Sequence, residues 1–408
     1  MLNVFTNTVP VGSLRRVTEA IRPRHEFIYH EGTAGADAVS LLMPPAPTPY
    51  GMDGGRLHPV FDMNLPEGDL RAAIVRLFSK ALPIFDDLTL LEIVGGSLIG
   101  RLRFGATQEP IKAENIRGIL HYRGTAGLFR DLLERYAKNS GISGVQPKLL
   151  LRDDGGLMSE QFSPLKPADR ITASGTTHII KTFDPVQFPA LAANEFLCLQ
   201  AAKAAGLPIP TVHLADDGGM LAVERFDLRA DGSYCAFEDL CSLAGRVSAD
   251  KYQGSYEQVA RTLAQILRGP DGVQAGMRQF FKTLTLSLVV GNGDAHRKNF
   301  GVLYEDATEA IRLAPVYDVL TTGIYIPGDA LALTLDGKKT WPDAKRVERF
   351  GVQRCQLTPK DAKDALAEVL QGVADTRRRF AEVSLPGEVA DKMQVVWENG
   401  LARLRADR

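Results

Sequence analysis

The chain has 408 residues, of which 45% are hydrophobic and 24% are charged. This length suffices for two or three packed units, and the composition is typical of a globular protein rather than a disordered one. Forty-eight basic residues against forty-nine acidic ones leave a formal charge of −1. The overall charge therefore gives no support for a protein that wraps nucleic acid or lies on an acidic membrane.

Cysteine spacing and the N-terminal residues bear on the cellular compartment. The four cysteines match no metal-binding pattern and are expected to be reduced thiols. The N-terminus lacks a basic region followed by an apolar core of signal-peptide length, and no run approaches the roughly 18 apolar residues of a membrane helix. We therefore expect a cytoplasmic protein.

The first 105 residues predict a small α+β unit. Short apolar runs, LNVFT, EFIYH and VSLLM, are separated by Gly and Pro and read as strands. A helix is expected to start at residues 66–69, because Leu70, Ile74, Leu77 and Leu82 then recur at helical spacing.

The middle of the chain predicts strands and two helices. Residues 126–138 predict a helix, residues 143–162 two strands joined by a turn at 153–156, and residues 177–183 a further strand. An amphipathic helix over 190–206 ends at Gly206, with Pro208 just beyond it. Residues 211–226 then predict a β-hairpin with its turn at 216–219.

Beyond residue 255 the chain is mainly helical, with a β-rich interruption at 299–335 and a helical tail over 359–406. This order predicts an α+β, two-lobed protein-kinase-like fold with a small N-terminal α/β subdomain and a helical C-terminal lobe. We place the N-terminal subdomain, packed on the small lobe, at 1–125, the β-rich nucleotide-binding lobe at 126–232, and the catalytic lobe at 233–408. A cleft between a β-rich and a helical lobe is a place where phosphates can be held from both sides.

The stretch LVVGNGDAHRKNFGVLYED, residues 288–306, combines turn residues with an acid and an amide five residues apart. Its glycines permit a tight loop with Asp294 at the tip, where a carboxylate can orient and deprotonate a hydroxyl. Asn299 offers a neutral oxygen for Mg²⁺, and Asp318 supplies the carboxylate that completes such a site. This spacing is that of protein-kinase-like phosphotransferases. Taken separately, the glycine-rich run fits an ordinary turn and Asp318 a capping residue.

Lys181 ends a β-rich run, from which a fixed positive charge can reach the α- and β-phosphates of ATP. Glu195 in the following helix is a candidate ion-pair partner that would hold the lysine in place. Both residues are also compatible with an ordinary solvated strand end and a solvated helix face.

Two further segments are candidates for nucleotide contacts. The loop before the strand LLL contains Ser140, Ser143 and Gly144, and exposed N–H groups in such a loop can cradle phosphate; it is not a Walker A motif. The segment LAVERFD places Glu224 and Phe226 where an extended backbone between two lobes can hydrogen-bond adenine. Asp227 would then meet a ribose hydroxyl. A flexible turn remains an alternative for the loop.

Seven sequence blocks together resemble the HipA family of serine/threonine kinases. They are SGISGVQPKLLL, THIIKTF, NEFLCLQAAKAAGLPIPTVHL, LAVERFD, FEDLCSLAG, GNGDAHRKNFGVLY and LAPVYDVL, in the order and at roughly the spacing of that family. The resemblance extends over about residues 1–400, because VGSL and FDMNLPEGDLRAAI look like the family's N-terminal subdomain.

The resemblance implies roles for individual residues. It makes Asp294 the catalytic base, Asn299 and Asp318 the Mg²⁺ ligands, and Lys181 the contact to ATP phosphate. His296 matches the family's DxHxKN pattern as a support of the loop. The resemblance also assigns adenine contacts to Glu224 and Phe226 and a place near the ribose to Asp227.

One position departs from the family's pattern. The phosphate-binding loop of the family often carries an autophosphorylated serine where this chain has Gly141. The resemblance therefore shifts the expected self-phosphorylation to Ser143, which lies in the loop, with Ser140 as the weaker candidate.

The resemblance implies a toxin of a bacterial toxin–antitoxin pair that uses ATP and Mg²⁺. Such toxins phosphorylate a cytosolic protein of translation, often an aminoacyl-tRNA synthetase. They are restrained by a helix-turn-helix antitoxin, so that DNA is reached only through this partner. Two alternatives stay open: a small-molecule phosphotransferase of the aminoglycoside-kinase type, and a non-catalytic nucleotide-binding corepressor subunit.

Overall fold

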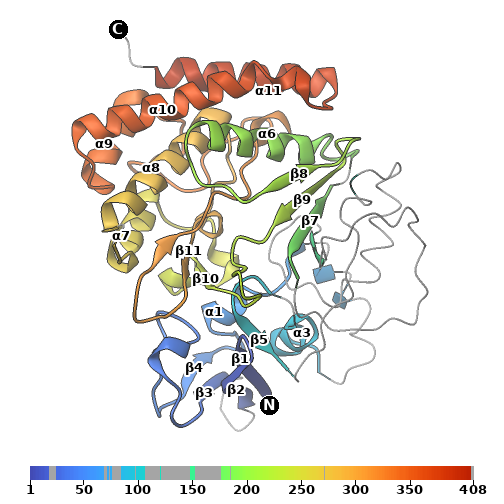
Figure 1. The fold of residues 1–408 in the computed structure, drawn as a ribbon, viewed down its shortest axis with the longest axis vertical. Helices are drawn as coiled ribbons and strands as arrows, with labels where there is room; N and C mark the ends of the chain where they lie inside the picture. Colours follow the sequence, from blue (N-terminus) through green and yellow to red (C-terminus); the bar gives the residue numbers. More distant parts are fainter. Residues whose placement is uncertain are drawn as a thin grey trace. The chain divides into compact units, whose positions relative to one another are not determined.

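The structure is a computed structural model, and it describes a defined part of the chain (Figure 1). The described residues are 1–17, 24–68, 71–72, 74–75, 84–96, 98–105, 120, 148–151, 176–183, 185–270 and 272–405. The helix expected at 126–138 and the second strand of the hairpin expected at 143–162 lie outside these residues. Most of the helix expected after residue 66 does so too.

Helices and strands alternate in the first half of the described chain, and helices dominate the second half (Figure 1). The strands are β1 Leu2–Thr6, β2 Val9–Val17, β3 Arg24–Tyr29, β4 Tyr50–Asp53, β5 Leu102–Phe104, β6 Lys148–Leu151, β7 His178–Thr182, β8 Val212–Leu214, β9 Met220–Glu224, β10 Ala236–Asp239, β11 Gly301–Tyr304 and β12 Arg312–Leu313. The α-helices are α1 Pro59–Asp62, α3 Asp87–Val94, α6 Leu191–Ala204, α7 Tyr256–Ile266, α8 Gly272–Val290, α9 Ala344–Arg354, α10 Pro359–Arg377 and α11 Gly387–Leu404.

The N-terminal part is a five-stranded sheet in the order β4-β3-β2-β1-β5, with antiparallel pairing throughout. Alternate residues of β1 are buried, as expected when one face of a sheet covers a core. Aromatic rings fill that core, where Phe61 contacts both Phe27 and Phe104. The strands expected from LNVFT and EFIYH are confirmed.

The prediction of a third strand in this region, from VSLLM, is wrong. Among its residues only Ser40 and Met43 form an isolated bridge. The physical reason is that side chains take its backbone donors: Val39 N–H donates to the Tyr29 hydroxyl, and Leu41 N–H donates to the Glu238 carboxylate. A strand ladder needs those donors for a neighbouring strand.

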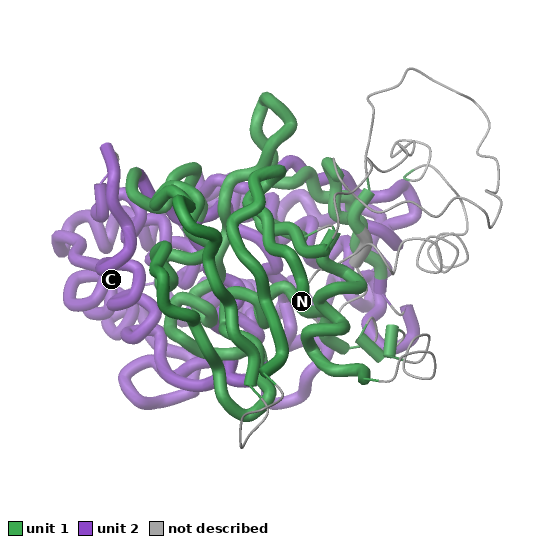
Figure 2. The backbone as a smooth tube through the Cα atoms, turned by 90° about the horizontal axis from the view of Figure 1, so that it is seen from below, with its two compact units in different colours: residues 1–182, 222–248, 303–309 green, residues 183–221, 249–302, 310–408 purple. Residues whose placement is uncertain are grey.

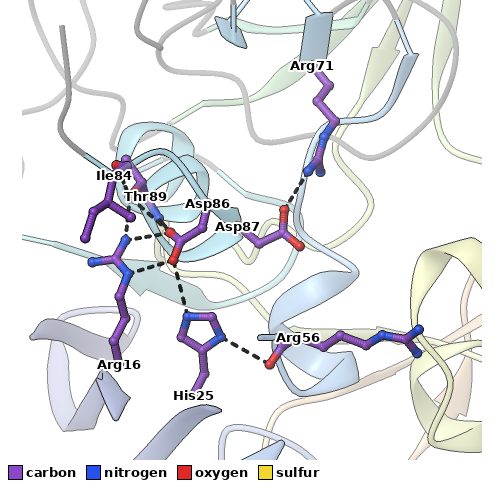
Figure 3. Close-up of polar contacts among 8 residues, drawn as sticks. All are labelled: Arg16, His25, Arg56, Arg71, Ile84, Asp86, Asp87 and Thr89. Atoms are coloured by element: carbon purple, nitrogen blue, oxygen red, sulfur yellow. Dashed lines mark hydrogen bonds and ion pairs between the residues drawn. The ribbon is translucent and has the colours of Figure 1, made fainter. Parts of the chain in front are cut away.

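An ion pair fixes the start of α3 against the sheet (Figure 3). Asp86 caps the helix by accepting the Thr89 N–H at 2.9 Å, and Arg16 from β2 reaches the same carboxylate at 2.6 Å through Nε. Burial acts to raise the pKa of Asp86, but the hydrogen bonds from Arg16 and Thr89 hold it well below its usual range. His25 from β3 approaches the same group at 3.5 Å.

Two further sheets carry the sequence blocks of interest, in the orders β6-β7-β9-β8 and β10-β11-β12. The strand expected at 177–183 and the hairpin expected at 211–226 are confirmed as β7 and as the pair β8 and β9. In the hairpin turn, Gly218 N–H donates to the carbonyl of Ala215, and Gly218 has φ +71°.

The chain divides into two compact units (Figure 2). Unit 1 contains Met1–Thr182, Ala222–Ser248 and Leu303–Glu309, and unit 2 contains Phe183–Leu221, Ala249–Val302 and Ala310–Arg408. Each unit is thus built from segments that are distant in the sequence. The three-part division expected from the sequence stays a prediction.

A buried carboxylate connects the segments of unit 1. Glu238 from β10 accepts hydrogen bonds from the Ser40 hydroxyl at 2.6 Å, the Leu41 N–H at 2.8 Å and the Tyr304 hydroxyl at 2.8 Å. Burial raises its pKa to about 6, although these three donors oppose the shift. Glu238 therefore ties the N-terminal residues to β10 and β11.

Unit 2 is built around the long buried helix α8, against which α10 and α11 both pack. The packing of α11 is tight enough to require glycine, since a Cβ on Gly400 would overlap the carbonyl oxygen of Val289 in α8. Within the described residues we find no helix that is both long and apolar enough to cross a bilayer.

We predict that Gly400→Ala destabilises the protein by about 1–3 kcal/mol, because the added methyl group overpacks the contact between α11 and α8. Gly387→Ala is the matched control in the same helix, where the new methyl group meets no atom within 4 Å. Its effect should be neutral or stabilising by up to about 1 kcal/mol. Urea unfolding of both variants measures the difference, and equal stabilities would contradict the close approach.

Candidate active site

The loop that carries Asp294 begins where α8 ends. Gly291 adopts φ +68°, and Asn292 N–H donates to the carbonyl of Ser287 at 2.8 Å, which terminates the helix. The Asn292 side chain then accepts the N–H of Asp294 at 3.1 Å. This short-range bond turns the chain at the residue where the sequence predicts a tight loop.

Asp294, Asn299 and Asp318 are brought together within unit 2. His296 N–H donates to the backbone oxygen of Asp294 at 2.7 Å and to the side-chain oxygen of Asn299 at 3.0 Å. The Asn299 amide donates in turn to the backbone oxygen of Asp318 at 3.4 Å. Asp294, Asn299 and Asp318 are therefore neighbours, although they span 25 positions, from 294 to 318.

The environment of Asp294 is suited to a base. Burial raises the pKa of its carboxyl, an effect opposed by the hydrogen bond from Tyr252 and by the charge of Lys251. The negative charges of Asp318 and Asp329 raise the pKa further. A carboxylate whose pKa lies above the ordinary Asp value accepts a proton more readily at neutral pH.

The segment after Asp318 is fixed by buried polar contacts. The Asn194 side chain from α6 accepts Thr321 N–H at 2.9 Å and donates to Thr321 O at 3.1 Å, as a neighbouring strand would. The indole of Trp397 in α11 donates to the Thr321 hydroxyl at 2.7 Å. Asp318 itself has φ +56°, a region that non-glycine residues rarely occupy, so these contacts hold an unfavourable backbone conformation in place.

A second link joins this segment to the loop of Asp294. The Thr322 hydroxyl accepts Gly293 N–H at 2.6 Å and contacts the Asp329 carboxylate. A Cβ on Gly293 would overlap that carboxylate. Position 293 therefore needs glycine because of a close approach.

Asn299 and Asp318 have the donor chemistry that Mg²⁺ prefers, a carboxamide oxygen and a carboxylate. The Asn299 oxygen already accepts His296 N–H, but a carbonyl oxygen has a second lone pair. In the part of the chain that the structure describes, no three His, Cys, Asp or Glu side chains gather as a metal cage. Two protein oxygens fit Mg²⁺ nonetheless, since this ion usually takes its other ligands from phosphates and water.

Lys181 and Glu195 are both buried, with 4% and 1% of their surfaces exposed. Burial excludes the solvated alternatives for a strand-end lysine and a helix-face glutamate. Lys181 lies in unit 1, at the end of β7, and Glu195 lies in unit 2, in α6. Their pairing, and the approach of Lys181 to Asp294, stay predictions.

The expected adenine and ribose contacts lie in unit 1. Glu224 is exposed, and Phe226 is half-buried with its ring 5.6 Å from that of Phe237. Asp227 is buried, and its carboxylate accepts hydrogen bonds from Arg225 at 3.0 Å and from Gly100 N–H at 2.6 Å. These partners are protein groups, so Asp227 has a structural function in this unit whatever it does toward a ribose.

The expected phosphate loop is outside the described residues. Ser140, Gly141, Ser143 and Gly144 all fall there, so the self-phosphorylation expected at Ser143 or Ser140 stays a prediction.

Sequence reasoning missed the residues that hold the site together. Tyr252, Asn194 and Asp329 contact the loop or the segment of Asp318 from distant positions. Asn194 stands inside a sequence block typical of the family, but a lone buried asparagine in an apolar helix has no readable partner in the sequence. Tyr252 and Asp329 carry no signal of spacing.

Two family models match the chain. The HipA N-terminal domain matches residues 2–105, and the HipA-like C-terminal domain matches residues 140–377. The chain belongs to the HipA family. The resemblance seen in the sequence is thereby confirmed.

Relatives and a solved structure agree with membership of the HipA family. "Putative kinase Y4dM" of Sinorhizobium fredii is 27% identical over 361 residues, covering 83% of this chain and 76% of the relative. "Putative kinase Y4mE" of the same organism is 29% identical over 287 residues, covering 65% and 64%.

A solved structure gives the fold. A chain from the Shewanella oneidensis MR-1 toxin–antitoxin complex of HipA, HipB and operator DNA matches with TM-score 0.70 and 18% identity, covering 99% of this chain and 96% of that one. The mixed α+β class, with N-terminal sheets and a helical C-terminal region, is confirmed.

We predict that Asn194→Asp destabilises the protein by about 2 kcal/mol or more, because a buried carboxylate oxygen would face the carbonyl of Thr321 where an amide now donates. Gln200→Glu is the matched control, since it makes the same chemical change at a half-buried position of α6. Thermal unfolding compares the two. A smaller loss in Asn194→Asp than in the control would contradict the pairing.

Proposed function

We propose that this HipA-family protein is an ATP- and Mg²⁺-dependent serine/threonine protein kinase. The observation that carries the proposal is the proximity of Asp294, Asn299 and Asp318 within one unit. A base, a carboxamide and a carboxylate in this order form the reactive part of kinase-like phosphotransferases. Both relatives are named as putative kinases, which supports the same proposed activity.

In the proposed mechanism Asp294 orients the acceptor hydroxyl and takes its proton as the hydroxyl oxygen attacks the γ-phosphorus. The raised pKa of this carboxyl suits it to accept the proton near neutral pH. Lys181, buried at the end of β7, would fix the α- and β-phosphates by its charge. Most of the rate enhancement in such a reaction comes from positioning and charge stabilisation.

Asn299 and Asp318 are the residues that would hold Mg²⁺. The ion, when bound, neutralises charge on the transferred phosphoryl group. His296, buried in the loop, keeps Asn299 facing the site through its N–H. Glu224 and Phe226 are the proposed backbone contacts for adenine.

We further propose that the kinase is the toxin of a bacterial toxin–antitoxin pair. The fold match to a chain from a complex of HipA, HipB and operator DNA supports this role. The proposed partner is a helix-turn-helix antitoxin that connects the kinase to DNA. The proposed substrate is a cytosolic translation protein, such as an aminoacyl-tRNA synthetase, with self-phosphorylation at Ser143 or Ser140.

We predict that Asp294→Asn lowers phosphate transfer by at least about 100-fold, because a neutral amide cannot take the hydroxyl proton. The measurement is transfer from labelled ATP with Mg²⁺ to the proteins of a bacterial cell extract and to the chain itself. Asp364→Asn in the exposed face of α10 is the control and should keep full activity.

Three outcomes would count against the kinase. Full activity of Asp294→Asn removes the base assignment. Label found only in small molecules indicates an aminoglycoside-type enzyme. Tight binding of an antitoxin without any ATP turnover indicates a corepressor subunit.

A further inference from the structure

Tyr252 contacts the Asp294 carboxylate directly. Its hydroxyl donates to Oδ1 of Asp294 at 2.6 Å. The tyrosine ring packs edge-on against His296, at 5.1 Å between ring centroids, and the Lys251 ammonium group lies 5.5 Å from the same ring. A hydrogen bond to an ionised acceptor is short and directional, so it fixes the orientation of the carboxylate.

Residues 251–258 also contact the loop of Asp294 at two further positions. The Tyr256 hydroxyl, which is buried, donates to the backbone oxygen of Ala295 at 3.0 Å. Arg297, 1% exposed, donates to the backbone oxygen of Gln253 at 2.8 Å and to the side chain of Gln258 at 2.6 Å. These contacts reach residues 295 and 297, on the C-terminal side of Asp294.

The segment is itself firmly built. Ser255 caps α7, and Gln258 completes a capping box. Gly254 has φ +100°, and a Cβ there would overlap the Arg297 guanidinium. The chain can therefore present Tyr252 to Asp294 from a backbone that is anchored to the residues directly after Asp294.

We propose that Tyr252 is the positioning residue of the catalytic base, and that it occupies Oδ1 of Asp294 so that Oδ2 faces the acceptor hydroxyl. This inference rests on the proposed kinase function. Without the bond, the carboxylate rotates about its χ2 torsion, which has broad minima, and the productive orientation becomes one of several. Proton transfer requires the acceptor oxygen within hydrogen-bond reach, so loss of orientation lowers the rate of the chemical step.

Tyr252 is 44% exposed. The main alternative to a positioning role is therefore that the Tyr252 hydroxyl is itself phosphorylated. A hydroxyl 2.6 Å from a base has the geometry of a substrate. The contacts along 251–258 favour positioning, because they fix this tyrosine to the same loop as the base, as a built part of the site.

The test is Tyr252→Phe, which keeps the ring against His296 and removes only the hydroxyl. The assay is phosphate transfer from labelled ATP with Mg²⁺ to cell-extract proteins over a range of ATP concentrations. We expect the maximal rate to fall about 10-fold to 100-fold, the size of one hydrogen bond to a charged group. The KM for ATP should stay unchanged, and the variant should stay folded at the assay temperature.

Tyr50→Phe is the matched control, since it removes a phenol that donates to the backbone oxygen of Pro44 in the N-terminal sheet region. It should leave the maximal rate unchanged. Equal rates for Tyr252→Phe and Tyr50→Phe overturn the proposal. A faster rate in Tyr252→Phe also overturns it, because the hydroxyl would then be a blocking group.

Two measurements keep this test separate from the kinase proposal. The carboxyl ¹³C resonance of Asp294, assigned with Asp294→Asn, should move in Tyr252→Phe and not in Tyr50→Phe, even if the wild type transfers no phosphate. An unmoved resonance overturns the contact. Mass spectrometry of the wild type after incubation with ATP should find Tyr252 unmodified, and phosphate on Tyr252 would make it an acceptor.

Discussion

The pairing of Asn194 with Thr321 is the contact on which the candidate site depends. Asp318 occupies a left-handed backbone conformation that is unfavourable for a residue with a side chain. The buried Asn194 amide pairs with both backbone polar groups of Thr321. Any other backbone conformation here would raise the free energy of the folded state, because those groups would lose their partners in the interior. The position of Asp318 therefore follows from a residue more than a hundred positions earlier in the chain.

Close packing transmits this constraint to the loop of Asp294. Helix α8 delivers the loop, α11 lies against α8 at Gly400, and Trp397 of α11 bonds Thr321. Helix α8, which leads into the loop of Asp294, and the segment that carries Asp318 thus share α11 as a support. Because packed interiors resist deformation, small shifts in these helices would move the reactive groups together rather than separately.

The proposed reactive groups were easier to identify from the sequence than the residues that support them. Asp294, Asn299 and Asp318 belong to a pattern with fixed spacing. The turn-forming residues around Asn292 predict the loop that the structure contains. Strand β1 follows the alternating pattern expected from the sequence, whereas β7 and α6 were predicted from residue type and end signals, because both are buried on most sides. Contacts such as Tyr252 with Asp294 depend on tertiary structure, which side-chain type and spacing do not encode. The failed strand at 39–43 has the same cause, since Glu238 takes a donor that a strand needs.

Buried charge explains why polar residues are the hardest to interpret from sequence. Lys181, Asp227 and Glu238 all stand in or after short apolar runs, and all three are buried. Asp227 is engaged by Arg225 and Gly100, and Glu238 by three donors, so each is compensated within unit 1. A charged group that is removed from water must be paired or must do chemistry, and a sequence alone does not distinguish these. The neighbouring groups distinguish the two cases. The raised pKa of Asp294 can therefore be interpreted only together with its neighbours Asp318 and Tyr252.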